Sequence, residues 1–339
     1  MKKTSLLFVL AVFVFMVLAS CTRTDIPTIP EEISTPNAVQ TAVAGLTYTS
    51  LVSVPGGTFT QESDANRDGD VLDTCESFVH AISAFCIGKY EVTNELWYAV
   101  YQWAISNGYT FAHEGSEGQA GTITSKNYEP VIFINWRDVI VWCNAYSQMT
   151  GRTPVYFSDS GFMNPLKDSI YAGEYLTVDT TPGSLDNPYV NWSADGFRLP
   201  TEGEWQYAAS YKDGSNWTPN NFASGAGADY TDNAACSAVA WHGLNSGSDI
   251  HDVGDISKTP NALGIHDMSG NAMEWCWDWS GDYPTAASSD YKGFASGSYR
   301  VVRGGSYLYP LVCLQVGDRS NSIPGHMFYD IGFRVARTL

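Results

Sequence analysis

Basic side chains are scarce in this sequence of 339 residues. It has 18 Lys and Arg against 36 Asp and Glu, which gives a formal net charge of −18. Contacts to nucleic-acid phosphates need clustered Lys and Arg, so we expect no nucleic-acid partner. The same negative charge disfavours an anionic lipid surface as a ligand.

Motifs of common enzyme and metal sites are also absent. No two cysteines have the CxxC spacing of a zinc or thioredoxin-like site, and there is no GxSxG or HExxH motif. The isolated histidines His242, His251, His266 and His326 are more typical of hydrogen-bond partners in turns or cores than of catalytic groups. No internal repeat or second linker divides residues 47–339, so we expect one large domain there.

The longest candidate for membrane insertion is an apolar run over residues 5–18, which follows two lysines. The run is short for a membrane span, and the small residues behind it predict a signal peptide over residues 1–20. The segment Leu-Ala-Ser-Cys at residues 18–21 resembles the lipobox of bacterial lipoproteins, so we expect the Cys21 sulfur to carry lipid. An ordinary signal peptide with an incidental cysteine is the alternative.

Residues 21–46 are rich in Pro, Thr and Ser and contain few large apolar side chains. Such a segment buries too little surface to offset its ordering entropy, which predicts a flexible tether. Thr22, directly after Cys21, favours the outer membrane over the inner membrane. We therefore expect a lipid-anchored protein of the bacterial cell envelope, held on the membrane by its N-terminus.

The remaining domain reads as a mixture of helices and short strands. Polar caps followed by apolar residues at helical spacing predict three helices, which begin after Thr93, Asn135 and Thr201. Two strands joined by a glycine turn are predicted over residues 51–60, and single strands over residues 84–92 and 332–337. From about residue 212 the chain is rich in Gly, Asn, Ser and Asp, which is typical of long loops. This pattern predicts an α+β domain.

Six segments have a recognisable order. They are VPGGTF at 54–59, IGKYEVTN at 87–94, FRLPTEGEW at 197–205, NALGIHDMSGNAMEW at 261–275, RGGS at 303–306 and GFRV at 332–335. In this order they resemble the formylglycine-generating-enzyme and sulfatase-modifying-factor family. The resemblance covers nearly all of residues 50–337. It implies a C-type-lectin-like fold of the α+β class, with short strands, long ordered loops and a few helices.

The copper site of the enzymes in this family is incomplete here. The resemblance implies two copper-binding cysteines in the stretch after RGGS, and thiolates suit Cu(I). Tyr309 stands where the first cysteine would be, and Cys313 falls one place short of the second. We therefore expect no copper, no catalytic residues and no enzyme activity. The alternative is a formylglycine-type or related oxidase that acts on exported proteins through Cys313.

Residues 307–330 mix aromatic, aliphatic and small polar types between the orderly RGGS and GFR motifs. The mixture resembles the variable region of proteins that a retroelement diversifies at AAY codons. The resulting NNY codons exclude Trp, Lys, Glu, Gln and Met, and only Gln315 and Met327 depart from that set. The resemblance implies a variable region at about 303–337.

Such a region implies a surface that binds a protein or another cell-surface ligand. The candidate ligand-binding residues are Tyr307, Leu308, Tyr309, Leu311, Cys313, Asp318, Ser320, Asn321, Ser322, Gly325, His326, Phe328, Tyr329 and Asp330. We expect exposure for Tyr309, Phe328 and Tyr329, whereas Tyr307 and Val312 fit core and surface equally. A structural lipoprotein without a specific ligand is a further alternative.

Calcium is the cofactor that the resemblance suggests. It implies a site formed by side chains of Asp267 and Glu274 and by the carbonyls of Gly270 and Ala272, since hard oxygen ligands suit Ca²⁺. In the alternative, the two carboxylates brace the loop by hydrogen bonds and no metal is bound. Residues 64–70 resemble the opening of an EF-hand loop, but Cys75 stands where a bidentate Glu belongs. A solvated acidic turn is therefore favoured there.

Overall fold

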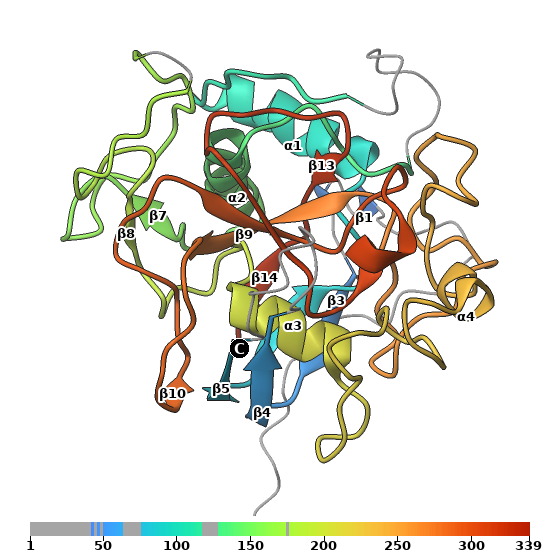
Figure 1. The fold of residues 1–339 in the computed structure, drawn as a ribbon. Helices are drawn as coiled ribbons and strands as arrows, with labels where there is room; N and C mark the ends of the chain where they lie inside the picture. Colours follow the sequence, from blue (N-terminus) through green and yellow to red (C-terminus); the bar gives the residue numbers. More distant parts are fainter. Residues whose placement is uncertain (1–41, 44–45, 48–49, 64–75, 117–127, 174–175) are drawn as a thin grey trace, which may run out of the picture. The chain divides into compact units, whose positions relative to one another are not determined.

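The computed structural model describes residues 42–43, 46–47, 50–63, 76–116, 128–173 and 176–339 (Figure 1). The described residues all belong to one compact unit. The predicted signal peptide, the lipidation site Cys21 and the acidic segment 64–70 lie outside the described residues. In the part that is described, no helix is long and apolar enough to cross a membrane.

The described helices are α1 (Asn94–Ser106), α2 (Trp136–Met149), α3 (Glu202–Ser210), α4 (Asn233–Ser237) and the short 3-10 helix η1 (Leu311–Leu314). The three predicted helix starts are confirmed. Thr93 caps α1 through its side-chain oxygen, and α2 and α3 begin with capping boxes, Asn135 with Asp138 and Thr201 with Glu204. These caps satisfy backbone amides that have no partner inside the helix.

The strands are short and form several small sheets. They are β1 (Ala42–Val43), β2 (Leu46–Thr47), β3 (Leu51–Val54), β4 (Gly57–Glu62), β5 (Ser77–Ile82), β6 (Phe85–Gly88), β7 (Tyr156–Phe157), β8 (Tyr189–Val190), β9 (Met273–Trp279), β10 (Ser288–Ser289), β11 (Arg300–Arg303), β12 (Arg319–Ser322), β13 (Ile331–Gly332) and β14 (Ala336–Thr338). The largest sheet has the order β12-β11-β9-β13, and two sheets have the orders β14-β6-β3 and β10-β5-β4. β1 pairs with β2 at the end of the predicted tether, and β7 pairs with β8.

The strand, glycine turn and strand predicted over residues 51–60 are confirmed as β3 and β4, which belong to different sheets because β3 pairs with β6 and β4 with β5. The single strand predicted over residues 332–337 is instead divided between the end of β13 and most of β14, because β13 pairs with β9 and β14 with β6. The predicted strand 84–92 is β6, which ends at Gly88.

β9 lies at the centre of the fold. Trp275 and Trp277 pack in the same core as α1 and α2, whereas Cys276 packs with Val301 and residues of α3. Successive side chains of a strand point to opposite faces, so β9 separates two cores. In Figure 1, α1 and α2 accordingly lie on one side of β9 and α3 on the other. This arrangement is the predicted α+β class.

Several cysteines belong to these cores. Cys86, Cys143, Cys236 and Cys276 are buried thiols that form no disulfide. Burial raises the pKa of the Cys143 thiol, which keeps it protonated at neutral pH. These side chains therefore act as small apolar core residues.

Candidate ligand-binding surface

The C-terminal segment begins with a tight turn after β11. Gly304 and Gly305 both have positive φ, 101° and 69°, which favours glycine. A side chain on Gly305 would collide with the carbonyl oxygen of Cys313. The RGGS motif therefore lets η1 lie close against the end of β11.

Six of the predicted ligand-binding residues are buried, which corrects their assignment to the binding surface. They are Tyr307, Cys313, Asp318, Ser322, Gly325 and Asp330. For Tyr307, which fitted core and surface equally, the core is correct. Tyr307 packs with Ile132 and Ile250, and the Ser306 hydroxyl donates to a carboxylate oxygen of Asp330 at 3.1 Å. These side chains support the surface from beneath.

The other eight predicted residues are at least partly exposed, and we call them the C-terminal surface. They are Leu308, Tyr309, Leu311, Ser320, Asn321, His326, Phe328 and Tyr329. Tyr329 is 45% exposed, as expected, whereas Tyr309 and Phe328 are half-buried because they also pack against the core under α1 and α2. Val312 is half-buried as well.

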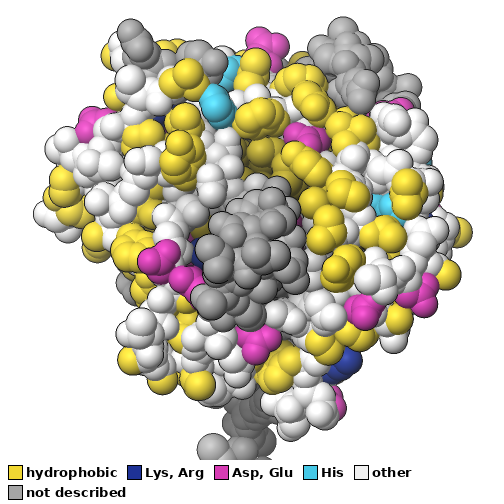
Figure 2. Space-filling model, in the orientation of Figure 1, with side chains coloured by type: hydrophobic (Ala, Val, Ile, Leu, Met, Phe, Trp, Pro, Cys, Tyr) yellow, Lys and Arg dark blue, Asp and Glu magenta, His cyan; other side chains and the backbone are white. Residues whose placement is uncertain are grey.

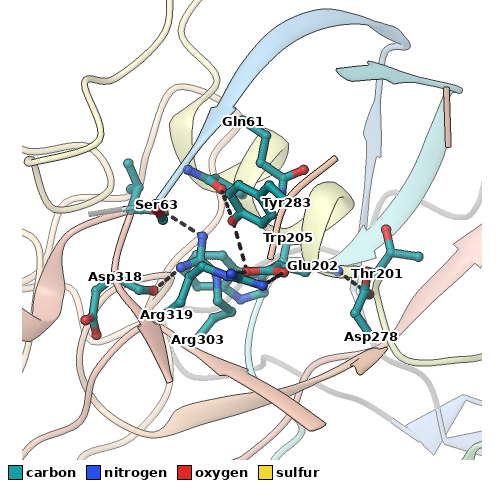
Figure 3. Close-up of polar contacts among 12 residues, drawn as sticks. Gln61, Ser63, Thr201, Glu202, Trp205, Asp278, Tyr283, Arg303, Asp318 and Arg319 are labelled. Atoms are coloured by element: carbon teal, nitrogen blue, oxygen red, sulfur yellow. Dashed lines mark hydrogen bonds and ion pairs between the residues drawn. The ribbon is translucent and has the colours of Figure 1, made fainter. Parts of the chain in front are cut away.

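Arg319 ties the middle of this segment to the framework (Figure 3). Its Nε and Nη2 donate to the two carboxylate oxygens of Glu202 in α3, at 2.6 and 2.9 Å. Burial opposes ionisation of Glu202, but the guanidinium groups of Arg319 and Arg303 outweigh it and lower the carboxyl pKa. β12 also pairs with β11 along its length. The predicted variable stretch is therefore two exposed parts joined by a fixed strand.

A pocket of about 550 Å³ opens beside the C-terminal surface. Its lining comes from four segments distant in sequence: Ala112 and His113; Asn135 and Arg137; Ser169, Ile170 and Tyr171; and Gly325, His326, Met327 and Phe328. A volume of this size is typical of ligand sites. Hydrophobic side chains are frequent on the face shown in Figure 2, across which the C-terminal segment runs in Figure 1.

His113 lines this pocket, and its imidazole is hydrogen-bonded to Asp138. The Nδ1 atom of His113 lies 2.7 Å from a carboxylate oxygen of the fully buried Asp138, and this hydrogen bond raises the pKa of the imidazole. Asp138 also accepts from the Ser169 hydroxyl and the Ala112 amide. The sequence analysis missed His113, because no motif links it to an aspartate 25 residues away.

Arg137 fixes the neighbouring wall of the pocket. Its Nε and Nη2 donate to the carboxylate of Asp186 at 2.6 and 2.9 Å. Its guanidinium carbon lies 4.0 Å from the ring centre of Tyr171. The ring of Tyr171 is therefore held from behind by a buried ion pair.

The two carboxylates of the implied calcium site, Asp267 and Glu274, differ in their hydrogen-bond partners. One carboxylate oxygen of Asp267 accepts from the Gly254 amide at 2.7 Å, but the other is buried without a hydrogen-bond partner among the described residues. Such an atom fits a cation. The carboxylate of Glu274 is instead occupied by Arg334, at 2.6 and 2.7 Å, and by the Trp205 indole at 2.9 Å. The site therefore fits calcium at Asp267 better than at Glu274.

Residues 36–339 match the family model described as a Sulfatase-modifying factor enzyme 1-like domain. Among solved structures, Treponema denticola variable protein 1 is 31% identical with a TM-score of 0.63, over 88% of this chain and 98% of that chain. The structure of CarF is 24% identical with a TM-score of 0.59, over 86% of this chain and 98% of that chain, and shows the fold alone.

Two named proteins are also similar. The chaperone protein LppX of Paenibacillus barcinonensis is 30% identical over 265 residues, 70% of this chain and 78% of its own length. The formylglycine-generating enzyme of Thermomonospora curvata is 31% identical over only 107 residues, 27% of this chain and 29% of its own length. The family and the C-type-lectin-like α+β fold predicted from the sequence are confirmed. The chain belongs to the family of sulfatase-modifying factor enzyme 1-like domains.

Proposed function

We propose that this chain is a non-enzymatic, lipid-anchored protein of the bacterial envelope that binds a protein or cell-surface ligand. The observation that carries the proposal is the C-terminal surface beside the 550 Å³ pocket. Partly exposed aromatic and aliphatic side chains lie there on a framework fixed by buried contacts such as Arg319–Glu202. Loops on a rigid scaffold are common sites of recognition.

We also propose that a retroelement diversifies about residues 303–337. The similarity to a treponemal protein named a variable protein supports this proposal. The test is the neighbouring DNA, which should contain a reverse transcriptase gene and an adenine-rich near-copy of the codons for this region. Neighbouring DNA with neither feature would contradict it.

The alternative is an oxidase of the formylglycine-generating type. Tyr309 at the first expected thiolate position and the burial of Cys313, which is 6% exposed, disfavour it. The test is copper-dependent oxidation of a cysteine-containing peptide. We expect no turnover. If the chain does turn over the peptide and Cys313→Ser abolishes this activity, the oxidase replaces the binding proposal.

A second binding role, as a chaperone, is favoured by the relative named chaperone protein LppX. An exposed apolar surface is compatible with unfolded clients as well as with one folded ligand. An aggregation assay with a client protein that unfolds on reduction distinguishes the chaperone role from binding of one folded ligand. Suppression at sub-equimolar ratios for unrelated clients would favour the chaperone, whereas the leading proposal expects no general suppression.

A structural calcium ion accompanies the proposal. Asp267 and the carbonyls of Gly270 and Ala272 would hold it, and Glu274 would contribute through lone pairs that Arg334 and Trp205 leave available. Burial raises the pKa of Asp267 to about 6, and a bound cation would favour the ionised form.

A further inference from the structure

We infer that the 550 Å³ pocket receives a large apolar side chain of a polypeptide ligand, with a basic residue next to it in the ligand. The inference rests on the proposed function and names the chemistry that its pocket recognises. It concerns the residues that the framework contributes to the pocket, such as His113 and Tyr171, as much as the C-terminal segment.

The mouth of the pocket is apolar and accessible. Ile170 is 56% exposed and Met327 is 47% exposed, and they come from two different segments of the lining. Phe328 and Tyr171, which also line the pocket, are partly exposed. Exposed apolar side chains in the lining of an open pocket favour an apolar occupant, since its burial removes both surfaces from water.

The framework wall is rigid before any ligand arrives. The Arg137–Asp186 ion pair is buried, and the guanidinium packs against the ring of Tyr171. Nη2 of Arg137 also donates to the Thr177 carbonyl at 2.8 Å, which anchors the loop that follows Tyr171. A pocket whose walls are already fixed loses less entropy on binding.

The polar part of the pocket suits a peptide backbone. Nδ1 of His113 is engaged by Asp138, so Nε2 is the imidazole atom available to a ligand. It accepts from an amide N–H when the imidazole is neutral and donates to a carbonyl when it is protonated. A polypeptide offers both groups next to every side chain, whereas a hydrocarbon ligand offers neither.

Charge selects the flanking residue. The charges of Arg137 and of protonated His113 are matched by Asp186 and by the aspartate beside the imidazole. Next in sequence to the lining residues His113 and Ser169, this leaves the exposed Glu114 and Asp168 and the half-buried Lys167. The net charge of the chain is −18, so a basic residue beside the apolar one adds attraction and speeds association.

The pocket continues into the rest of the C-terminal surface, which favours a ligand larger than a small molecule. The Phe133 amide donates to the Phe328 carbonyl at 2.9 Å, and the rings of Phe133 and Tyr329 lie 6.5 Å apart. The hydroxyl of Tyr307 reaches the Tyr329 carbonyl at 3.4 Å. An extended segment with one side chain in the pocket can lie across this connected surface.

The test is selection of a displayed library of random linear peptides on the immobilised domain, followed by affinity measurement of the enriched peptides. We expect enrichment of a large apolar residue adjacent to Lys or Arg. The double variant Ile170→Asn with Met327→Asn should weaken binding about tenfold to a hundredfold, the range for losing burial of one apolar side chain. Asp168→Asn with Glu114→Gln should weaken it less, and mainly at low salt.

Controls separate this inference from the proposed function. Met163→Asn with Ile256→Asn removes apolar groups that are 78% and 80% exposed and do not line the pocket, and it should leave affinity unchanged. Leu308→Ser with Tyr329→Ser alters the surface outside the pocket. Affinity lost in this variant but kept in the pocket variant would overturn the pocket inference and leave the proposed function standing. A selection with no enriched peptide, or with acidic peptides enriched, would also overturn it.

Discussion

Arg319 and Glu202 form a buried bidentate ion pair between β12 and α3, with Nε–Oε1 at 2.6 Å and Nη2–Oε2 at 2.9 Å. Arg319 falls inside the stretch 307–330 that reads from the sequence as variable. The pair shows that this stretch contains a fixed structural member. Diversity at the surface therefore has to be confined to the exposed positions on either side of Arg319 and to the outward side chains of β12.

Breaking this pair should be costly. Arg319→Ala leaves the buried Glu202 carboxylate with the Tyr283 hydroxyl at 3.1 Å and with Arg303 at 3.6 Å as its remaining cation, so we expect a loss of about 3 kcal/mol in the free energy of unfolding. Arg152→Ala is the matched control, because its ion pair with Asp195 is long, 3.4 Å, and exposed. The control should cost less than ~1 kcal/mol. Urea unfolding measures both, and equal losses would contradict the structural role of Arg319.

Asp278 should make stability depend on pH. Burial, aided by the carboxylate of Glu202, raises its pKa to about 8. In the unfolded chain it titrates near ~3.9, so the stability from the protonated group is complete below about pH 4 and is lost as pH rises to about 8. Asp278→Asn removes this loss and keeps an acceptor for the Glu202 amide. We expect the difference in free energy of unfolding between the variant and the native chain to grow by roughly 3 kcal/mol, in favour of the variant, from pH 5 to pH 8.

The control for this measurement is Asp195→Asn at a half-exposed position. Burial of Asp195 is slight, and hydrogen bonds from Thr153 and the charge of Arg152 lower its pKa. Asp195 is thus ionised in both states from pH 5 to pH 8, and its substitution should shift stability equally at both. If Asp278→Asn also changed the free energy of unfolding by the same amount at pH 5 and at pH 8, Asp278 would be ionised in the folded chain.

The parts of the fold that sequence predicts are local. Thr93, Asn135 and Thr201 were identified as caps because capping depends on residues three positions apart. The burial of Asp330 was not predicted, and that of Tyr307 was left open, because both depend on contacts with distant segments. The pocket was not predicted for the same reason, since His113 and Phe328 come together in its lining only in the folded chain.

Calcium should stabilise the domain if it binds at Asp267. A ligand at 100 times its dissociation constant adds about 2.7 kcal/mol when it binds only the folded state. We therefore expect calcium to raise the melting temperature above that in chelator, with little effect of magnesium. Asp267→Asn should remove the response. Identical melting temperatures with calcium and with chelator would reject the site.

Lipidation should depend on Cys21. If the Cys21 sulfur carries the lipid, Cys21→Ser should leave a protein that washes off membranes and takes up no labelled palmitate. Cys86→Ser is a control, since that thiol is buried in the folded domain. Continued palmitate labelling of the Cys21→Ser protein would reject the lipobox interpretation.

Selection from two matched libraries tests the central claim, recognition through the C-terminal surface, most directly. One library varies Leu308, Tyr309, Leu311, Phe328 and Tyr329; the other varies the outer face of α1 at Tyr98, Tyr101, Gln102, Ile105 and Ser106. Both are displayed on the same framework and selected against the same panel of purified proteins. We predict specific binders predominantly from the C-terminal library. Surface substitutions usually cost less than ~0.5 kcal/mol each, and we expect the folded clones to keep apolar residues at the half-buried positions 309 and 328. Equal yields from the two libraries, or binders only from α1, would contradict the account.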